Sequence, residues 1–288
     1  MVGAAQHADR TGWHCCYLAD HFMGDGVSFG DPGTPTFEVT AAIGALASTT
    51  TRIRLGTLVL GNTYRHPAVV AKWAATVDHI SGGRLTLGLG AGWQVNEHEQ
   101  YGIDLPAPGE RISRFDEACT AIGSLLRDPV TDLHGRYYRL TGALAEPLPL
   151  QRPLPLLIGG KGDRMLGIVA RLGDAWNMWG LPTTVAERGA LLDHQCERIG
   201  RDPAEVARST QALFRLTDDP GEAARFIESV SPRAAVAGDA DHIAGVVTDW
   251  ADVGIDEVIV PDWTLGIGNE RLRTMDRLRN DVFREVDT

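Results

Sequence analysis

Short apolar runs that alternate with helix-period segments are the feature of this chain that most restricts its fold. Each run is apolar on both faces, which is typical of strands in a parallel sheet that helices cover on both sides. Seven such runs occur, at residues 15–20, 53–60, 84–92, 154–160, 174–178, 209–214 and 257–262. The spacing predicts helices at residues 3–10, 37–48, 67–80, 110–126, 163–172, 183–199, 239–253 and 269–286, with Thr183 as an N-cap. We therefore expect an α/β fold.

The number of strand and helix pairs favours a barrel over an open, doubly wound sheet. No glycine-rich dinucleotide fingerprint follows the first run, and 288 residues suit one barrel of about 250 residues. A (β/α)8 barrel needs eight strands, whereas the sequence predicts seven, and the helix-like residues 3–10 lead directly into the first of them. We expect residues 1–288 to form a single TIM-type (β/α)8 barrel domain that lacks its first strand.

One connection is longer than the others. Residues 128–152 exceed the usual length of a connection between elements. Within them, LHGRYYRLTG at residues 133–142 alternates as a small hairpin does, and a proline-rich stretch follows. We expect an insertion around residues 128–152 that lies outside the barrel.

The charge balance argues against several classes of partner. Asp and Glu number 38 against 27 Lys and Arg, so the formal net charge is −11. Nucleic-acid affinity comes mostly from cations that neutralise phosphates, so we expect no nucleic-acid partner. No run of about 18 apolar residues is present, and residues 1–13 lack a signal-peptide pattern, so we expect a cytoplasmic protein without a membrane span. The four cysteines have no metal-binding spacing, and we expect no metal site.

The carboxyl ends of barrel strands are where such folds carry their active sites. Asp20 and His21 end the first run. A histidine there can move a proton near neutral pH, and the adjacent carboxylate of Asp20 can tune it. Four tryptophans also fall at or near strand ends, where they either hold a planar ligand or pack beneath the loops: Trp93, Trp176, Trp179 and Trp263.

A glycine-rich loop with a lysine follows the run at residues 154–160. Gly159, Gly160, Lys161 and Gly162 stand immediately before the helix predicted at residues 163–172. Consecutive glycines let backbone N–H groups converge on an anion, and a helix N-terminus adds partial positive charge. Lys161 is one of only two lysines in the chain. The loop is either a phosphate cradle or a plain turn with solvated charges.

Several stretches in the same order resemble the bacterial-luciferase-like superfamily of flavin and deazaflavin enzymes. They are GTLVLGNTYRHPAVVAKWAATVDHISGGRLTLGLGAGW (56–93), NEHEQYGIDLPAPGERISRFDEA (96–118), HGRYYRL (134–140) and PLPLLIGGKGDRMLGIVARLGDAWN (153–177). Within the superfamily the chain looks closest to the probable coenzyme F420-dependent oxidoreductases. The resemblance implies a luciferase-like TIM-type barrel with the cofactor lying across the strand ends.

The resemblance also assigns roles to individual residues. It implies that Asp20 and His21 form an Asp-His pair beside the reactive face of the deazaflavin, and that Leu58 and Val59 form a cis peptide behind the ring. It further implies cofactor contacts from Ala91, Gly92, Trp93 and Asn96, and a cofactor-phosphate loop formed by Gly159, Gly160, Lys161 and Gly162.

Two positions depart from the sugar-phosphate dehydrogenases of this branch. Trp93 stands where those relatives carry a catalytic glutamate, and Asp25 stands where they carry a tryptophan. The substrate chemistry of those relatives is therefore not carried over to this chain.

Three functions follow as hypotheses. The first is an F420-dependent oxidoreductase that transfers a hydride between the deazaflavin and a small organic substrate, with His21 as the proton donor or acceptor. The second is an FMN-dependent luciferase-like monooxygenase, and the third is a cofactor-free barrel that acts as a partner subunit. Because relatives are often dimers, a homodimer is possible.

Overall fold

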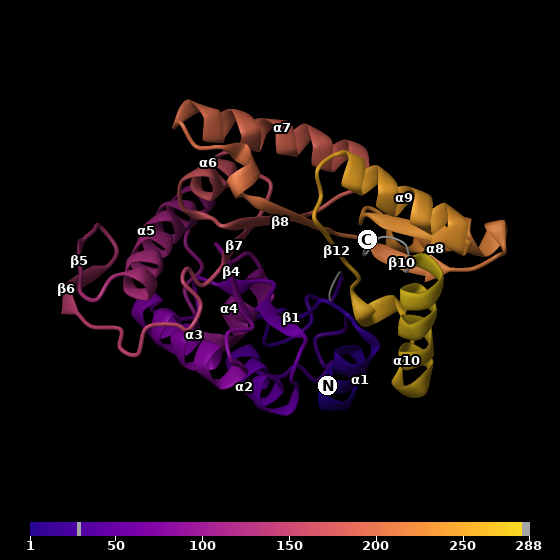
Figure 1. Ribbon diagram of the computed structural model, residues 1–288, viewed down its shortest axis with the longest axis horizontal. Coiled ribbons are helices and arrows are strands. Elements are labelled where there is room, and N and C mark those ends of the chain that lie inside the picture. Colours follow the sequence, from indigo (N-terminus) through magenta and orange to yellow (C-terminus); the bar gives the residue numbers. More distant parts are fainter. Residues whose placement is uncertain (28–29, 284–288) are drawn as a thin grey trace. The chain divides into compact units, whose positions relative to one another are not determined.

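The computed structural model describes residues 1–27 and 30–283. These residues form two compact units; most of the first comes before Gly160 on the colour scale of Figure 1, and most of the second comes after it. The first unit comprises Met1–Asp9, His14–Gly159 and Leu172–Asp174. The second comprises Arg10–Trp13, Gly160–Arg171 and the chain from Ala175 onward.

The first unit is built on four parallel strands. They lie in the order β1 (Cys15–Leu18), β2 (Arg54–Thr57), β4 (Leu85–Gly90) and β7 (Leu156–Gly159), and the two-residue β3 (Leu60–Gly61) pairs with the end of β4. Every residue of β4 is buried, as expected of a strand that is covered on both faces.

Helices surround the strands of the first unit. The helix α1 (Val2–Thr11) comes first in the chain, and α2 (Val39–Thr49), α3 (Pro67–Ser81) and α5 (Pro108–Arg127) lie side by side in Figure 1. Their inner faces bury residues such as Ile43, Leu46, Phe115 and Ile122 almost completely. The short helix α4 (Val95–Tyr101), which the apolar spacing did not predict, follows β4.

The predicted hairpin is confirmed. The strands β5 (Thr131–His134) and β6 (Arg139–Ala143) pair antiparallel. The carboxylate of Glu117, on α5, accepts hydrogen bonds from the backbone N–H groups of Arg136, Tyr137 and Tyr138 and so ties the turn to the helix.

The second unit continues the alternation of strands and helices. The strands β8 (Ala175–Trp179), β9 (Ala207–Gln211) and β12 (Glu257–Ile259) pair in parallel in that order, and β10 (Leu213–Leu216) pairs in parallel with β11 (Ala235–Gly238). Its helices are α6 (Asp163–Leu172), α7 (Pro182–Arg198), α8 (Pro220–Val230), α9 (Ala240–Asp252) and α10 (Gly268–Arg277).

Most of the predicted elements are present, with differences that have local causes. The run at 209–214 contains the end of β9 and the start of β10, because the ladder changes partner at Ala212. The prediction of Thr183 as an N-cap was wrong: α7 begins one residue earlier, at Pro182, whose fixed φ suits the first helical position. The helix predicted at 269–286 passes into a π-helical turn at Leu278–Val282, and residues 284–286 lie outside the described residues.

The absence of a first barrel strand is also visible. Within the described residues, β1 pairs only with β2, β12 pairs only with β9, and α1 leads into β1 with no strand before it. No helix in the described ranges combines the length and the apolar character that crossing a membrane requires.

Candidate active site

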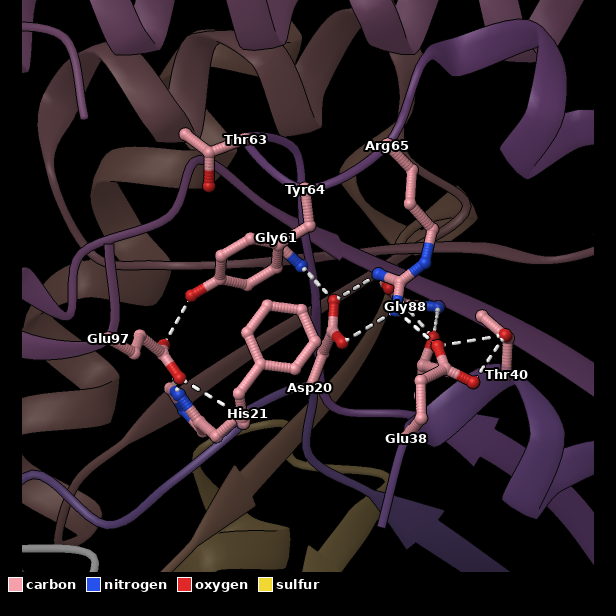
Figure 2. A network of polar contacts seen from close by, with 12 residues as sticks. Asp20, His21, Glu38, Thr40, Gly61, Thr63, Tyr64, Arg65, Gly88 and Glu97 are labelled. Carbon is pink, nitrogen blue, oxygen red and sulfur yellow. Dashed lines mark hydrogen bonds and ion pairs between the residues drawn. The ribbon is translucent and has the colours of Figure 1, made fainter. Parts of the chain in front are cut away.

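His21 lies just beyond the carboxyl end of β1 and contacts a buried carboxylate. Its Nδ1 atom is 2.8 Å from Oε1 of Glu97, which is the third residue of α4 (Figure 2). The Glu97 side chain is completely buried, whereas the His21 side chain is 15% exposed. The imidazole is therefore held from the interior while part of it stays accessible.

Glu97 also accepts hydrogen bonds from two other groups. The backbone N–H of Phe22 donates to Oε2 at 2.8 Å, and the Tyr64 hydroxyl donates to Oε1. Burial raises the pKa of Glu97, but the hydrogen bonds from His21, Tyr64 and Phe22 outweigh it and leave the pKa below its ordinary value. Burial, and then the bond to Glu97, raise the pKa of Tyr64. At neutral pH the site therefore holds a carboxylate and a neutral phenol.

Asp20 is engaged elsewhere. Its two carboxylate oxygens bind Arg65 Nη1 at 2.6 Å and Nη2 at 3.0 Å, and Oδ2 also accepts the backbone N–H of Gly61 at 2.9 Å. Arg65 Nη2 in turn binds Oε1 of Glu38, the N-cap of α2, at 2.5 Å. The sequence placed Asp20 as the carboxylate that tunes His21, but in the structure the carboxylate in contact with His21 is Glu97.

Aromatic rings lie next to His21 and next to the Tyr64 ring, whose hydroxyl binds Glu97. Trp93 is 49% exposed and meets His21 edge to face, with ring centroids 5.5 Å apart. The Tyr64 ring stacks on His98 at 4.8 Å, and His98 is fixed by Thr63 Oγ1 at 2.8 Å and the Gln94 carbonyl at 2.6 Å. The residues that surround the imidazole are thus themselves held by rings and hydrogen bonds.

The ends of β2, β4 and β7 meet at Val59. The Leu58–Val59 peptide bond is cis, as the resemblance implied, and the Leu58 N–H donates to the Leu18 carbonyl at 2.8 Å. A Cβ on Gly90 would lie 2.5 Å from Val59 Cγ2, and one on Gly159 would lie 3.0 Å from Cγ1. Val59 therefore fits only because glycines stand opposite it.

Further predicted site residues lie in the loop after β4. Gly92 has φ +86°, and a Cβ there would lie 2.7 Å from Thr63 Oγ1, so the position requires glycine. Asn96 Nδ2 donates to the Gly24 carbonyl at 3.0 Å, close in sequence to His21. In the first unit, strand ends and adjoining loops carry Asp20, His21, Leu58, Val59, Ala91, Gly92, Trp93 and Gly159, and the first turn of α4 carries Asn96.

The remaining predicted residues belong to the second unit. Gly160 accepts a hydrogen bond from Trp176 Nε1 at 2.7 Å, and its N–H donates to the Asn177 carbonyl at 3.0 Å. The Gly162 carbonyl accepts the Leu166 N–H in the first turn of α6, and the Lys161 side chain is exposed. The glycine loop thus leads into a helix N-terminus, and its phosphate role stays a prediction.

Sequence reasoning missed Glu97. It lies on a seven-residue helix, too short for apolar periodicity to reveal, and three of its neighbours at residues 98–100 are polar as well. The available signal was the order of residues after the strand, in which the polar stretch NEHEQ (96–100) follows the glycine-rich end of the predicted strand (84–92) after three residues.

Comparison with known proteins identifies the family of the chain. A family model described as luciferase-like monooxygenase matches residues 1–246, and the chain belongs to this family of enzymes. The F420-dependent glucose-6-phosphate dehydrogenase of Mycobacterium avium (strain 104) is 30% identical over 295 residues, which cover 90% of this chain and 86% of that protein.

Solved structures have the same fold. An F420-dependent secondary alcohol dehydrogenase in complex with an F420-acetone adduct has a TM-score of 0.80 at 19% identity and covers 95% of this chain and 92% of its own. The monooxygenase RslO1 from Streptomyces bottropensis has a TM-score of 0.82 at 21% identity, with 99% and 92% covered. These likenesses confirm the predicted fold class, a TIM-type luciferase-like fold without its first strand.

Proposed function

We propose that this enzyme is an F420-dependent oxidoreductase that transfers a hydride between the deazaflavin and a small organic substrate. The observation that carries the proposal is the accessible imidazole of His21 at a strand end, tied through Nδ1 to the buried carboxylate of Glu97. The relative from Mycobacterium avium supports the choice of cofactor, because its name gives F420 as its cofactor and it matches nearly the whole chain.

The residues of the first unit fit a deazaflavin ring. Gln94 lies between Trp93 and Asn96, is 1% exposed, and its Oε1 atom has no hydrogen-bond partner among the described residues. Its amide nitrogen donates to the Met23 carbonyl at 3.0 Å, which fixes the amide beside the segment that carries His21. A buried acceptor without a donor costs free energy. An N–H group of the pyrimidine-like ring of F420 is the kind of donor that would satisfy it.

The cofactor and the protein chain contribute different parts of the proposed reaction. When bound, F420 supplies a carbon centre that accepts or gives a hydride and reacts poorly with oxygen. Leu58 and Val59 would lie behind the ring and His21 would exchange the proton, while a phosphate contact of Gly160–Gly162 is what the family resemblance implies. Trp93 adds an exposed apolar face next to the imidazole.

An FMN-dependent monooxygenase is the second candidate. The likeness to the monooxygenase RslO1 favours it, since the TM-score of 0.82 is as high as that to the F420 enzyme. Both cofactors have a planar ring and a phosphate, so the same residues would contact either one. The two candidates differ in whether the enzyme uses a deazaflavin or a flavin, and in whether oxygen is consumed.

Side-by-side titration with F420 and FMN separates the candidates. Both cofactors absorb visible light, so binding is measured by the absorbance change and by equilibrium dialysis. We expect F420 to bind with a Kd at least tenfold below that of FMN. Tighter binding of FMN, with oxygen uptake in the presence of a flavin reductant, would replace the proposal by the monooxygenase. Binding of neither cofactor would favour a cofactor-free partner subunit.

A further inference from the structure

We infer that Glu97 is the positioning residue that fixes His21 with its hydrogen on Nδ1, so that Nε2 is the nitrogen that exchanges a proton with the substrate. The inference rests on the proposed function only for the role of the proton. The placement of the hydrogen is a property of the protein by itself.

The first step of the argument concerns which atom donates. An ionised carboxylate can only accept hydrogen bonds, and a neutral imidazole carries its hydrogen on one nitrogen. Nδ1 of His21 is 2.8 Å from Oε1 of Glu97, so the hydrogen between them belongs to Nδ1. Nε2 is then the basic nitrogen of the neutral ring.

The second step concerns how firmly the carboxylate is held. Glu97 is completely buried and accepts from Phe22 N–H at Oε2 and from the Tyr64 hydroxyl at Oε1 (Figure 2). These bonds leave the carboxylate little freedom to rotate, and the Tyr64 ring is itself stacked on His98. The orientation of the His21 ring is therefore fixed by the immobilised carboxylate of Glu97 at Nδ1.

The third step excludes the other carboxylate nearby. Asp20 is adjacent to His21 in sequence, but both of its oxygens are bound to Arg65 and one also accepts the Gly61 N–H. Asp20 therefore pairs with Arg65, which also pairs with Glu38. Of the carboxylates of Asp20 and Glu97, the one that contacts His21 Nδ1 is that of Glu97.

The proton transfer itself is simple for a hydroxyl substrate. A bond from Nε2 to hydrogen forms as the substrate O–H bond breaks, and the electron pair stays on the substrate oxygen. That pair would become the second bond of the carbonyl as the neighbouring carbon gives up its hydride to oxidised F420, the acceptor that the proposed function supplies. The resulting imidazolium is stabilised by the charge of Glu97, and it returns the proton to solvent from Nε2.

A nitrogen NMR experiment tests the placement of the hydrogen without cofactor or substrate. Two-dimensional spectra of ¹⁵N-labelled histidine distinguish the two tautomers, and the His21 signals are assigned by their loss in His21→Asn. In the wild type we expect the neutral His21 ring to carry its hydrogen on Nδ1. His98 serves as an internal reference, because its Nδ1 faces the Gln94 carbonyl, which can only accept.

The isosteric variant Glu97→Gln should change the tautomer. An amide offers one acceptor oxygen, and the Phe22 N–H requires it at the Oε2 position. The amide NH₂ then faces Nδ1, which favours the hydrogen on Nε2. Tyr64→Phe removes one donor to Glu97 and should leave His21 protonated on Nδ1. Glu99→Gln, on the exposed face of the same helix, is the matched control and should change neither histidine.

The outcomes separate this inference from the proposed function. A wild-type His21 that carries its hydrogen on Nε2 would overturn the inference, even if F420 is bound and turned over. The wild-type spectrum decides this point, so the result does not depend on whether a variant folds. The expected tautomers without any F420 turnover would leave the inference standing and end the proposed function. With turnover, Glu97→Gln should lower kcat about 10- to 1000-fold with KM within about twofold, since acid–base catalysis supplies roughly 10²–10⁴. An unchanged kcat would contradict the positioning role.

Discussion

Arg65 binds both carboxylate oxygens of Asp20, with Nη1 to Oδ2 at 2.6 Å and Nη2 to Oδ1 at 3.0 Å. Asp20 is 3% exposed, so this pair is a charge bridge inside the first unit. The same guanidinium reaches Glu38 at the start of α2, and Asp20 accepts the N–H of Gly61 in β3. The two ion pairs of Arg65 thus tie the loop after β3 to the end of β1 and to the start of α2.

The variant Arg65→Met should therefore be strongly destabilised. Among the described residues, removing Arg65 leaves the buried carboxylate of Asp20 with only the Gly61 N–H, and breaking a buried pair costs about 3–5 kcal/mol. Urea denaturation measures the free energy of unfolding. Arg127→Met is the matched control, because Arg127 pairs with Asp174 while both side chains are partly exposed, and such pairs contribute about 0–1 kcal/mol. Equal losses in the two variants would contradict the account of Asp20.

The variant Gly88→Ala should disrupt the packing of β4 against the end of β2. A Cβ at this position would lie 1.8 Å from the Thr57 carbonyl oxygen, and Gly88 also exchanges hydrogen bonds with Thr57 Oγ1 at 2.8 and 3.0 Å. Overpacking typically costs about 1–3 kcal/mol, and backbone cannot move aside as a side chain can. Gly44→Ala on α2, where a Cβ meets nothing within 4 Å, should instead stabilise by about 0.5–1 kcal/mol. Thermal unfolding of both variants checks the difference in sign.

Acid should weaken the contact between α1 and residues 51–53, which the carboxylate of Asp9 makes. Burial raises the pKa of Asp9, but hydrogen bonds from the backbone N–H groups of Ile53, Arg52 and Thr51 outweigh it and lower the pKa from 3.8 to about 2. A lowered pKa contributes stability that is complete above pH 3.8 and is lost as the pH falls towards 2. The gap in unfolding free energy between wild type and Asp9→Asn should therefore shrink over that range. A gap that stays constant between pH 5 and pH 2 would show that the charge of Asp9 is not involved.

Much of the fold could be predicted from the sequence, because the strands are apolar on both faces and therefore stand out in any window. The candidate site was harder. His21, Val59 and Gly92 were found through strand ends and a family resemblance, whereas Glu97 was missed because it acts from a short polar helix across 76 positions in sequence. Contacts of that kind leave no periodic signal. Thr183 is an error of the opposite kind: its side chain suits an N-cap, but the helix begins at Pro182, so Thr183 lies inside it.

The variant Lys161→Ala should weaken F420 binding through the phosphate alone. A lost charge-assisted contact is worth about 1.5–3 kcal/mol, or roughly ten- to a hundredfold in Kd. A deazaflavin fragment without the phosphate should bind wild type and variant alike. Lys72→Ala, which changes the only other lysine, is the control and should leave both affinities unchanged. Equal losses for F420 and for the fragment would remove Lys161 from the phosphate site.

A crystal structure of the enzyme with F420 tests the central claim most directly. The account predicts the deazaflavin ring against Leu58 and Val59, a donor of the ring on Gln94 Oε1, Nε2 of His21 on the side of the reactive carbon, and the phosphate on Gly160–Gly162. A cofactor whose reactive carbon lies away from His21, or whose phosphate lies away from the Lys161 loop, would contradict it.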